Sequence, residues 1–159
     1  MKEVNEILQN FINKLKEREI EFNLIQLKDR AMTVEEVMKF SDGKLNPKEI
    51  CKTLILKDHE NNSYAIVALG NDRIDFEKVS KRFNCSKLRL ATPEEVKHET
   101  RLEIGAVCPL FLNLPMLIDR RIFSRKKVNF GSGDHLFGIE IKPKDILKCV
   151  EAKISDVVK

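Results

Sequence analysis

Cys51-Lys52-Thr53-Leu54-Ile55-Leu56 and Tyr64-Ala65-Ile66-Val67-Ala68-Leu69 are two strongly apolar runs, and the polar tract Asp58–Ser63 joins them. Short apolar runs that are rich in β-branched residues and bounded by turn-forming residues predict sheet strands. Because only a short polar tract separates them, the two strands are expected to pair as a hairpin. This hairpin is the centre from which the rest of the fold is predicted.

Helices and further strands are predicted on both sides of the hairpin. Apolar residues at spacings of three and four, or a capping residue before them, predict helices at residues 2–19, 33–40, from Asp75, from Thr92 to about Thr100, and from Lys144 to about Val150. Further strands are expected at 21–27, 87–90, 116–118, 128–130 and 136–141. Residues 105–113 combine turn signals with apolar side chains and predict a loop pressed against the core. The fold class is therefore α+β (mixed α/β), with a mixed, mostly antiparallel sheet or open barrel flanked by helices.

Composition limits the class of protein. The chain has 159 residues, of which 42% are apolar and 34% charged, as expected for one soluble globular domain over residues 1–159. No run is long and apolar enough to span a bilayer, and the first residues lack the apolar core of a signal peptide. A cytoplasmic protein without a membrane partner is expected.

The charge and the aromatic content restrict the partners. A net charge of +4 tolerates a polyanion but is too small to indicate one, and no DNA partner is predicted. With no Trp and a single Tyr, a stacking platform for single-stranded nucleic acid is not expected. Contacts with RNA would be directed mainly at phosphates and would be sensitive to salt.

The sequence predicts neither a metal nor a cofactor. No two of its cysteines have the C-x-x-C spacing of a zinc or redox site, and its histidines are scattered. The residues concerned are Cys51, Cys85, Cys108 and Cys149, and His59, His98 and His135. In a cytosolic protein the four cysteines are expected to stay reduced and to pack as small apolar side chains.

Lys52 and the segment 105–109 are candidate site residues, and the sequence allows both a structural and a functional interpretation of each. Lys52 begins an otherwise apolar strand, so its side chain must extend to the surface or enter a pocket. The segment Gly105-Ala106-Val107-Cys108-Pro109 is either a plain structural turn or a loop that presents consecutive N–H groups to an oxygen atom. Cys108 is not assigned as a nucleophile, because no neighbour in the sequence would lower the pKa of its thiol.

Two more candidates lie nearer the C-terminus. Asp119 follows the strand 116–118, where a carboxylate forms a turn, caps a helix or contacts a ligand. His135 ends the glycine-rich segment 131–135, which also contains Ser132, and a histidine there is either solvated or reaches a ligand.

The order of these features resembles that of a known family. Thr33-Val34-Glu35-Glu36 opens a short helix, Lys52-Thr53-Leu54 opens a strand, and Arg89 to Val96 reads RLATPEEV. A Gly-x-x-x-Pro loop from Gly105, a strand ending in Asp119 and a glycine-rich loop follow in the same order. Over about residues 30–150 the chain resembles the YbaK / prolyl-tRNA-synthetase-associated domain, which removes wrongly attached amino acids from tRNA.

The resemblance implies an aminoacyl-ester hydrolase without a metal. Lys52 and Gly105 correspond to the residues that act at the ester: the lysine contacts the terminal adenosine or the ester, and the loop amides hold the carbonyl oxygen. Water, or the thiol of a cysteinyl substrate, would be the nucleophile. The substrate-binding set expected from the resemblance is Thr33, Thr53, Ala106, Val107, Cys108, Pro109, Asp119, Ser132 and His135.

The identity of the amino acid is predicted from departures within the family. Some members that remove cysteine carry an acidic residue where this chain has Gly138, and His135 is similar to the loop histidine of the alanine-directed branches. The chain is therefore predicted to deacylate tRNA(Pro) carrying alanine or cysteine, with alanine favoured. An aminoacyl-tRNA synthetase is a possible further partner. The alternatives are an adaptor that binds the tRNA acceptor end or a synthetase without catalysis, and hydrolysis of another small acyl ester.

Overall fold

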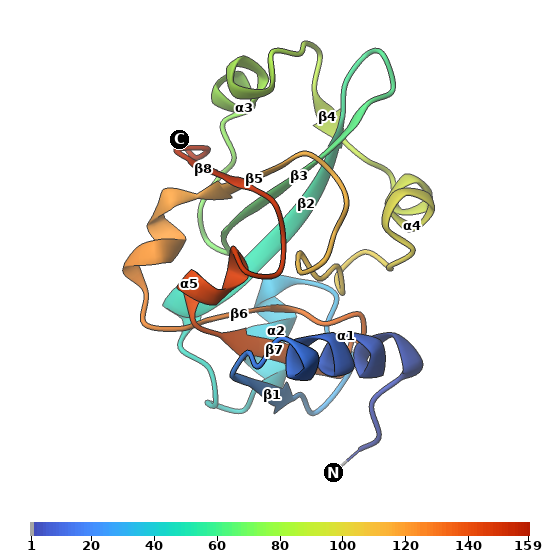
Figure 1. Ribbon diagram of the computed structural model, residues 1–159, viewed down its shortest axis with the longest axis vertical. Helices are drawn as coiled ribbons and strands as arrows, with labels where there is room; N and C mark the ends of the chain where they lie inside the picture. The colour runs from blue at the N-terminus through green and yellow to red at the C-terminus, as the bar shows by residue number, and fades with distance from the viewer. Residues whose placement is uncertain (1) are drawn as a thin grey trace.

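The computed structural model describes residues 2–159 as an α+β fold with two sheets (Figure 1). Its α-helices are α1 (Glu6–Glu17), α2 (Val34–Phe40), α3 (Phe76–Phe83), α4 (Pro93–Thr100) and α5 (Pro143–Ile146), and two 3-10 turns are η1 (Pro47–Glu49) and η2 (Arg120–Ser124). The strands are β1 (Phe22–Gln26), β2 (Cys51–Lys57), β3 (Ser63–Leu69), β4 (Arg89–Leu90), β5 (Met116–Asp119), β6 (Val128–Gly131), β7 (Phe137–Ile141) and β8 (Lys153–Ser155).

The predicted hairpin lies at the centre of the larger sheet. β2 and β3 pair antiparallel from Cys51 opposite Leu69 to Lys57 opposite Ser63, and the five strands follow the order β4-β2-β3-β5-β8. The β3–β5 and β5–β8 pairs are parallel, while all other pairs between named strands are antiparallel. The prediction of a mostly antiparallel arrangement is confirmed.

The predicted α+β class is confirmed, and the strands are divided between two sheets, because β1, β7 and β6 form a second sheet of three strands. An isolated bridge between Ile50 and Asn129 brings the beginning of β2 to β6, so the two sheets meet at that point. The larger hydrophobic core collects buried side chains from both sheets, among them Ile55, Ile118 and Ile139. The hairpin thus spans from the edge of the second sheet to the far end of the molecule (Figure 1).

Local sequence chemistry accounts for the helix starts. The hydroxyl of Thr33 accepts a hydrogen bond from the Glu36 N–H at 3.1 Å, and the Asp75 carboxylate accepts from Glu77 N–H at 3.0 Å. Thr92 and Glu95 form a reciprocal capping box, with Pro93 at the first helical position. Each of these side chains satisfies an N–H group that has no partner within its own helix.

The C-terminal segment departs most from the predicted elements. α5 ends at Ile146 instead of near Val150, and the short strand β8 follows it, which the sequence did not predict. β8 has three residues, two of them exposed, and therefore carries no alternating apolar pattern. No helix in residues 2–159 has the length and apolar character required to cross a membrane.

Candidate active site

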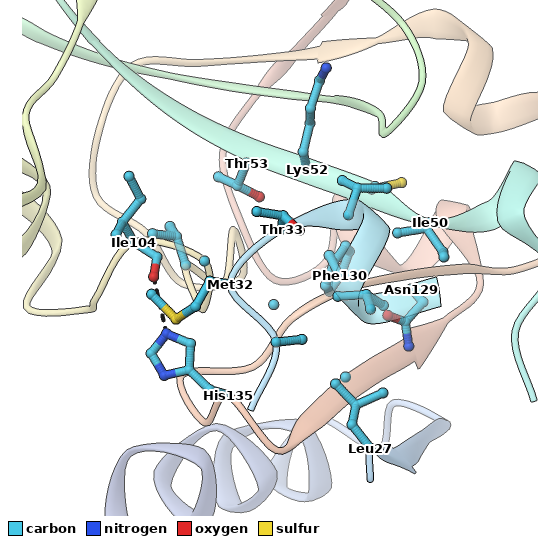
Figure 2. Close-up of a pocket in the computed structure, with 18 of the residues that line it drawn as sticks. Leu27, Met32, Thr33, Ile50, Lys52, Thr53, Ile104, Asn129, Phe130 and His135 are labelled. Atoms are coloured by element: carbon cyan, nitrogen blue, oxygen red, sulfur yellow. Dashed lines mark hydrogen bonds between the residues drawn. The ribbon is translucent and has the colours of Figure 1, made fainter. Parts of the chain in front are cut away.

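A cavity of about 280 Å³ opens where the two sheets meet (Figure 2). Its walls come from the start of α2, the first half of β2, the loop after α4, and the β6–β7 hairpin. Most of the side chains lining it are apolar, including Met32, Val37, Ile50 and Phe130. Six residues of the predicted site lie on this cavity: Thr33, Lys52, Thr53, Gly105, Val107 and His135.

Two glycines let the walls of the cavity approach each other backbone to backbone. Gly105 has φ +86°, and a Cβ atom there would lie 2.7 Å from the carbonyl oxygen of Met32. A Cβ atom on Gly131 would lie 2.5 Å from the carbonyl oxygen of Val107. Only glycine fits such close approaches, and only glycine adopts the left-handed conformation of residue 105 without strain. The loop that begins at Gly105 therefore packs between Met32, which precedes α2, and β6.

The loop leaves some of its N–H groups free for a ligand. Ala106 donates its N–H to the Glu103 carbonyl at 3.0 Å, and its own carbonyl accepts from Gly133 at 2.8 Å. Within residues 2–159, the N–H groups of Gly105 and Val107 donate to no protein acceptor. Of the predicted run of donors, two thus remain free at the cavity wall, which suits an oxygen atom that develops negative charge.

His135 ties the cavity walls together and is buried. One ring nitrogen, Nε2, lies 3.0 Å from the Ile104 carbonyl oxygen, and the other, Nδ1, lies 3.0 Å from Nη2 of Arg30. Since the guanidinium can only donate, Nδ1 accepts and Nε2 carries the proton that it donates to Ile104. The backbone carbonyl of His135 also accepts from Ala31 N–H at 3.0 Å. Figure 2 shows the imidazole beneath Ile104, where it positions the residue before Gly105.

Lys52 lines the cavity with its stem but not with its amine. Its Nζ donates to the backbone carbonyls of Gly70, at 3.3 Å, and of Asp72. Figure 2 shows the amine directed away from Asn129 and His135. Burial lowers the pKa of Lys52, and the carboxylates of Asp72 and Glu35 partly offset this effect. The amine is thus held at the turn after β3 by these two carbonyl groups.

Thr33 and Thr53 both line the cavity, but only the Thr33 hydroxyl has a hydrogen-bond partner. The hydroxyl of Thr33 already caps α2, which occupies it as an acceptor. The hydroxyl of Thr53 is buried and has no hydrogen-bond partner among residues 2–159. A buried hydroxyl without a partner costs free energy.

The remaining loop residues of the predicted set lie behind the cavity. Ala106, Cys108 and Pro109 are buried, and none of them lines it. Burial raises the pKa of the Cys108 thiol to about 12, so that the thiolate is not formed at neutral pH. The hydroxyl of Ser132 is consumed in its own turn, where it donates to the carbonyls of Asp134 and Phe137.

Asp119 lies away from the cavity, at the end of β5. Its fully buried carboxylate accepts hydrogen bonds from the N–H groups of Arg121 and Val157, both at 3.1 Å, and pairs with the Arg121 guanidinium at 3.1 Å. Arg121 in turn contacts Asp156 at 2.9 Å. These contacts join η2 to the C-terminal segment, which is a structural role.

Asp119→Ala is accordingly expected to destabilise the protein and to spare its chemistry. The substitution leaves the N–H groups of Arg121 and Val157 without their acceptor and leaves the Arg121 guanidinium with Asp156 alone, which should lower the free energy of unfolding by about 2–4 kcal/mol. Urea denaturation would measure the loss, and the rate of the ester hydrolysis that the resemblance implies should remain within about twofold of wild type in the protein that stays folded. A large loss of rate in the folded variant would return Asp119 to the substrate-binding set.

The structure adds one cavity residue, Asn129, that the sequence analysis did not single out. Asn129 is buried and lines the cavity, and Gly138 lies beside it on the neighbouring strand. A Cβ atom on Gly138 would lie 2.5 Å from the Asn129 amide, so the glycine provides the space that this amide fills. The available signal was an asparagine inside a predicted strand, because asparagine is depleted in strands. Among residues 2–159, no three His, Cys, Asp or Glu side chains are grouped to hold a metal ion.

Comparison with known proteins finds relatives in sequence and in fold. The chain is 27% identical to the uncharacterized protein YwhH of Bacillus subtilis (strain 168) over 136 residues, which cover 84% of this chain and 85% of YwhH. The crystal structure of hypothetical protein APE2540 superposes with a TM-score of 0.83 at 28% identity, covering 94% of this chain and 99% of the other. A candidate trans-editing enzyme for prolyl tRNA synthetase has the same fold, with a TM-score of 0.83, 23% identity and 99% of each chain covered.

A match to a family model identifies the family to which the chain belongs. The model for the aminoacyl-tRNA editing domain matches residues 28–149. This range contains every residue that lines the cavity except Leu27. α1 lies outside the matched range. The match spans most of the 159 residues, and the chain therefore belongs to the aminoacyl-tRNA editing domain family.

Proposed function

We propose that the protein is a trans-editing hydrolase that deacylates mischarged aminoacyl-tRNA, with residues 1–159 acting as one editing domain in the cytoplasm. The observation that carries the proposal is that Gly105 and Val107, two residues that line a largely apolar cavity, have N–H groups without a protein acceptor among residues 2–159. Attack on an aminoacyl ester places negative charge on the carbonyl oxygen. Fixed N–H donors lower the barrier by stabilising that charge without reorganising.

The other residues of the site would position the ester. His135 holds Ile104 and so fixes the direction of the Gly105 N–H group. Lys52 would turn its amine from Gly70 and Asp72 to the terminal adenosine or the ester, supplying a positive charge by position and not by proton transfer. The nucleophile would be a bound water, or the substrate's own thiol for a cysteinyl ester.

The cavity is suited to a small amino acid. The sequence favours alanine or cysteine attached to tRNA(Pro), and Met32, Val37 and Ile50 would limit the size of the side chain that enters. Size selection of this kind is worth about 1–3 kcal/mol per methylene, so one methylene separates substrates by a factor of about 10 to 200. The tRNA acceptor end would be read by this chain alone or together with an aminoacyl-tRNA synthetase.

The test is release of the amino acid from tRNA(Pro) charged separately with alanine, cysteine, serine and proline. Release of a noncognate amino acid at a rate well above the spontaneous rate, with prolyl-tRNA(Pro) spared, is the expected result. Binding of every charged tRNA without release from any would instead favour the adaptor function. A matched reaction with the Gly105→Ala variant would show that release comes from this site.

A further inference from the structure

The β6–β7 turn, residues 132–136, holds the loop that begins at Gly105 by two hydrogen bonds. A trans peptide unit is planar, and its C=O and N–H groups point in opposite directions. The Ile104 carbonyl and the Gly105 N–H belong to one such unit, and no peptide bond among residues 2–159 is cis. His135 Nε2 lies 3.0 Å from the Ile104 carbonyl oxygen, so this side chain of the turn fixes the direction of the Gly105 N–H.

The second free N–H group of the loop is held in the same way. The Ala106 carbonyl and the Val107 N–H share a peptide unit, and the Ala106 carbonyl accepts a hydrogen bond from the Gly133 N–H at 2.8 Å. Both carbonyl groups are thus held from the β6–β7 turn, and the N–H groups of the same two peptide units point away from it. A movement of the turn would therefore redirect both N–H groups together.

The N-terminus of α1 fixes the position of the β6–β7 turn. The N–H of Asn5 donates to the Asp134 carboxylate at 2.9 Å, and the Asn5 side-chain amide donates to the Gly133 carbonyl at 3.0 Å. The buried Asp134 carboxylate also accepts from the Leu136 N–H at 3.0 Å. Ile7 packs on the same turn, because a Cβ atom on Gly133 would lie 2.5 Å from its Cγ2 atom. α1 therefore contacts the turn directly, although it lies outside the range that the family model matches.

We propose that Asp134 and Asn5 are positioning residues for ester hydrolysis, because they join α1 to the β6–β7 turn and the turn directs the N–H groups of Gly105 and Val107. This inference rests on the proposed function and adds α1 to its site. Both residues act through the turn on the loop, without contact to the reacting atoms. A displacement of about 1 Å at a catalytic group can cost a factor of about 100 in rate, so loosening of the turn is expected to slow the reaction.

Asp134→Ala is the test variant, and Asp75→Ala is its matched control. The Asp75 carboxylate also accepts two backbone N–H groups, at the start of α3, and it does not line the cavity. On the mischarged tRNA that wild type hydrolyses, Asp134→Ala should lower kcat about tenfold and change KM less than about twofold, because the loop amides act mainly on the transition state. Asp75→Ala should leave both constants within about twofold of wild type.

Asn5→Ser tests the same contact from the side of α1. Serine caps a helix about as well as asparagine, so the variant should keep α1 and lose only the amide donor to the Gly133 carbonyl. The loss of one hydrogen bond should lower kcat about threefold. An unchanged kcat in both Asn5→Ser and Asp134→Ala would overturn the inference.

A double variant separates action through the loop from contact with the substrate, because Asp134 also lines the cavity. In Gly105→Ala the loop is already displaced, so the further change Asp134→Ala should lower kcat by less than about twofold. Two single effects that multiply in the double variant would show that Asp134 acts elsewhere than on the loop, and would overturn the inference.

Nuclear magnetic resonance of the free protein gives a readout that does not depend on activity. The amide signals of Gly105 and Val107 should move in Asp134→Ala and in Asn5→Ser, and they should stay in place in Asp75→Ala. Signals that stay in place in all three variants would overturn the inference. Release of no amino acid by wild type would refute the proposed function, and the amide signals alone would then decide whether α1 holds the loop.

Discussion

Replacement of Gly105 by alanine is expected to lower the rate of deacylation about a hundredfold or more. A Cβ atom at this position would lie 2.7 Å from the oxygen and 2.8 Å from the Cα of Met32, and neither backbone atom can move without moving the start of α2. The loop must therefore shift, and its free N–H groups shift with it. A displacement of about 1 Å at a catalytic group can cost a factor of about 100 in rate. Steady-state hydrolysis of the preferred mischarged tRNA measures the effect.

Gly43→Ala separates backbone strain from the displacement of the loop. Gly43 also has a positive φ, +76°, but a Cβ atom there meets nothing within 4 Å, and the residue does not line the cavity. Both alanine variants should lose about 1–2 kcal/mol of stability from the left-handed conformation, and Gly105→Ala should lose more because of the contact with Met32. Only Gly105→Ala should lose activity. Full activity in a folded Gly105→Ala variant would exclude the loop amides from catalysis.

The parts of the fold that follow local rules could be predicted from the sequence. The β2–β3 hairpin and the caps at Thr33, Asp75 and Thr92 depend on residues that are close in sequence, and each is confirmed. The division into two sheets could not be predicted, because it depends on which strands meet across long stretches of chain. The bridge from Ile50 to Asn129 is such a pairing, and no local pattern indicates it.

Some residues of the candidate site could likewise be predicted from the sequence, while the roles of others could not. Spacing and order brought Lys52, Gly105 and His135 to attention, and the structure groups them around one cavity. The roles of Asp119 and Asn129 depended on facts that only the fold supplies. Asp119 accepts a hydrogen bond from the N–H of Val157, 38 residues away, and the buried Nδ2 atom of Asn129 lies beside Gly138 without a partner among residues 2–159. Burial and pairing across long sequence distances thus distinguish a structural carboxylate from an unpaired amide.

Lys52→Ala is expected to lower deacylation about a hundredfold while the protein stays folded. If the amine leaves Gly70 and Asp72 to contact the substrate, its loss removes a positive charge from the developing negative charge of the ester, an effect of about 10²–10³ for a single donor in such sites. Its other role, as a support for the turn after β3, predicts a loss of stability instead. Steady-state kinetics and urea denaturation of the same variant separate the two.

Lys52→Met and Lys57→Met sharpen the comparison within one strand. Methionine at residue 52 keeps the apolar stem along the cavity wall and removes only the amine, so it should lose as much activity as alanine if the charge is what acts. Lys57, at the other end of β2, is buried and pairs with Glu99 at 3.1 Å, away from the cavity. Lys57→Met should cost about 2–3 kcal/mol of stability with little change in the rate of the folded enzyme. If Lys52→Met instead behaves like Lys57→Met, losing stability but keeping its rate, Lys52 supports the fold and the ester is held by the loop amides alone.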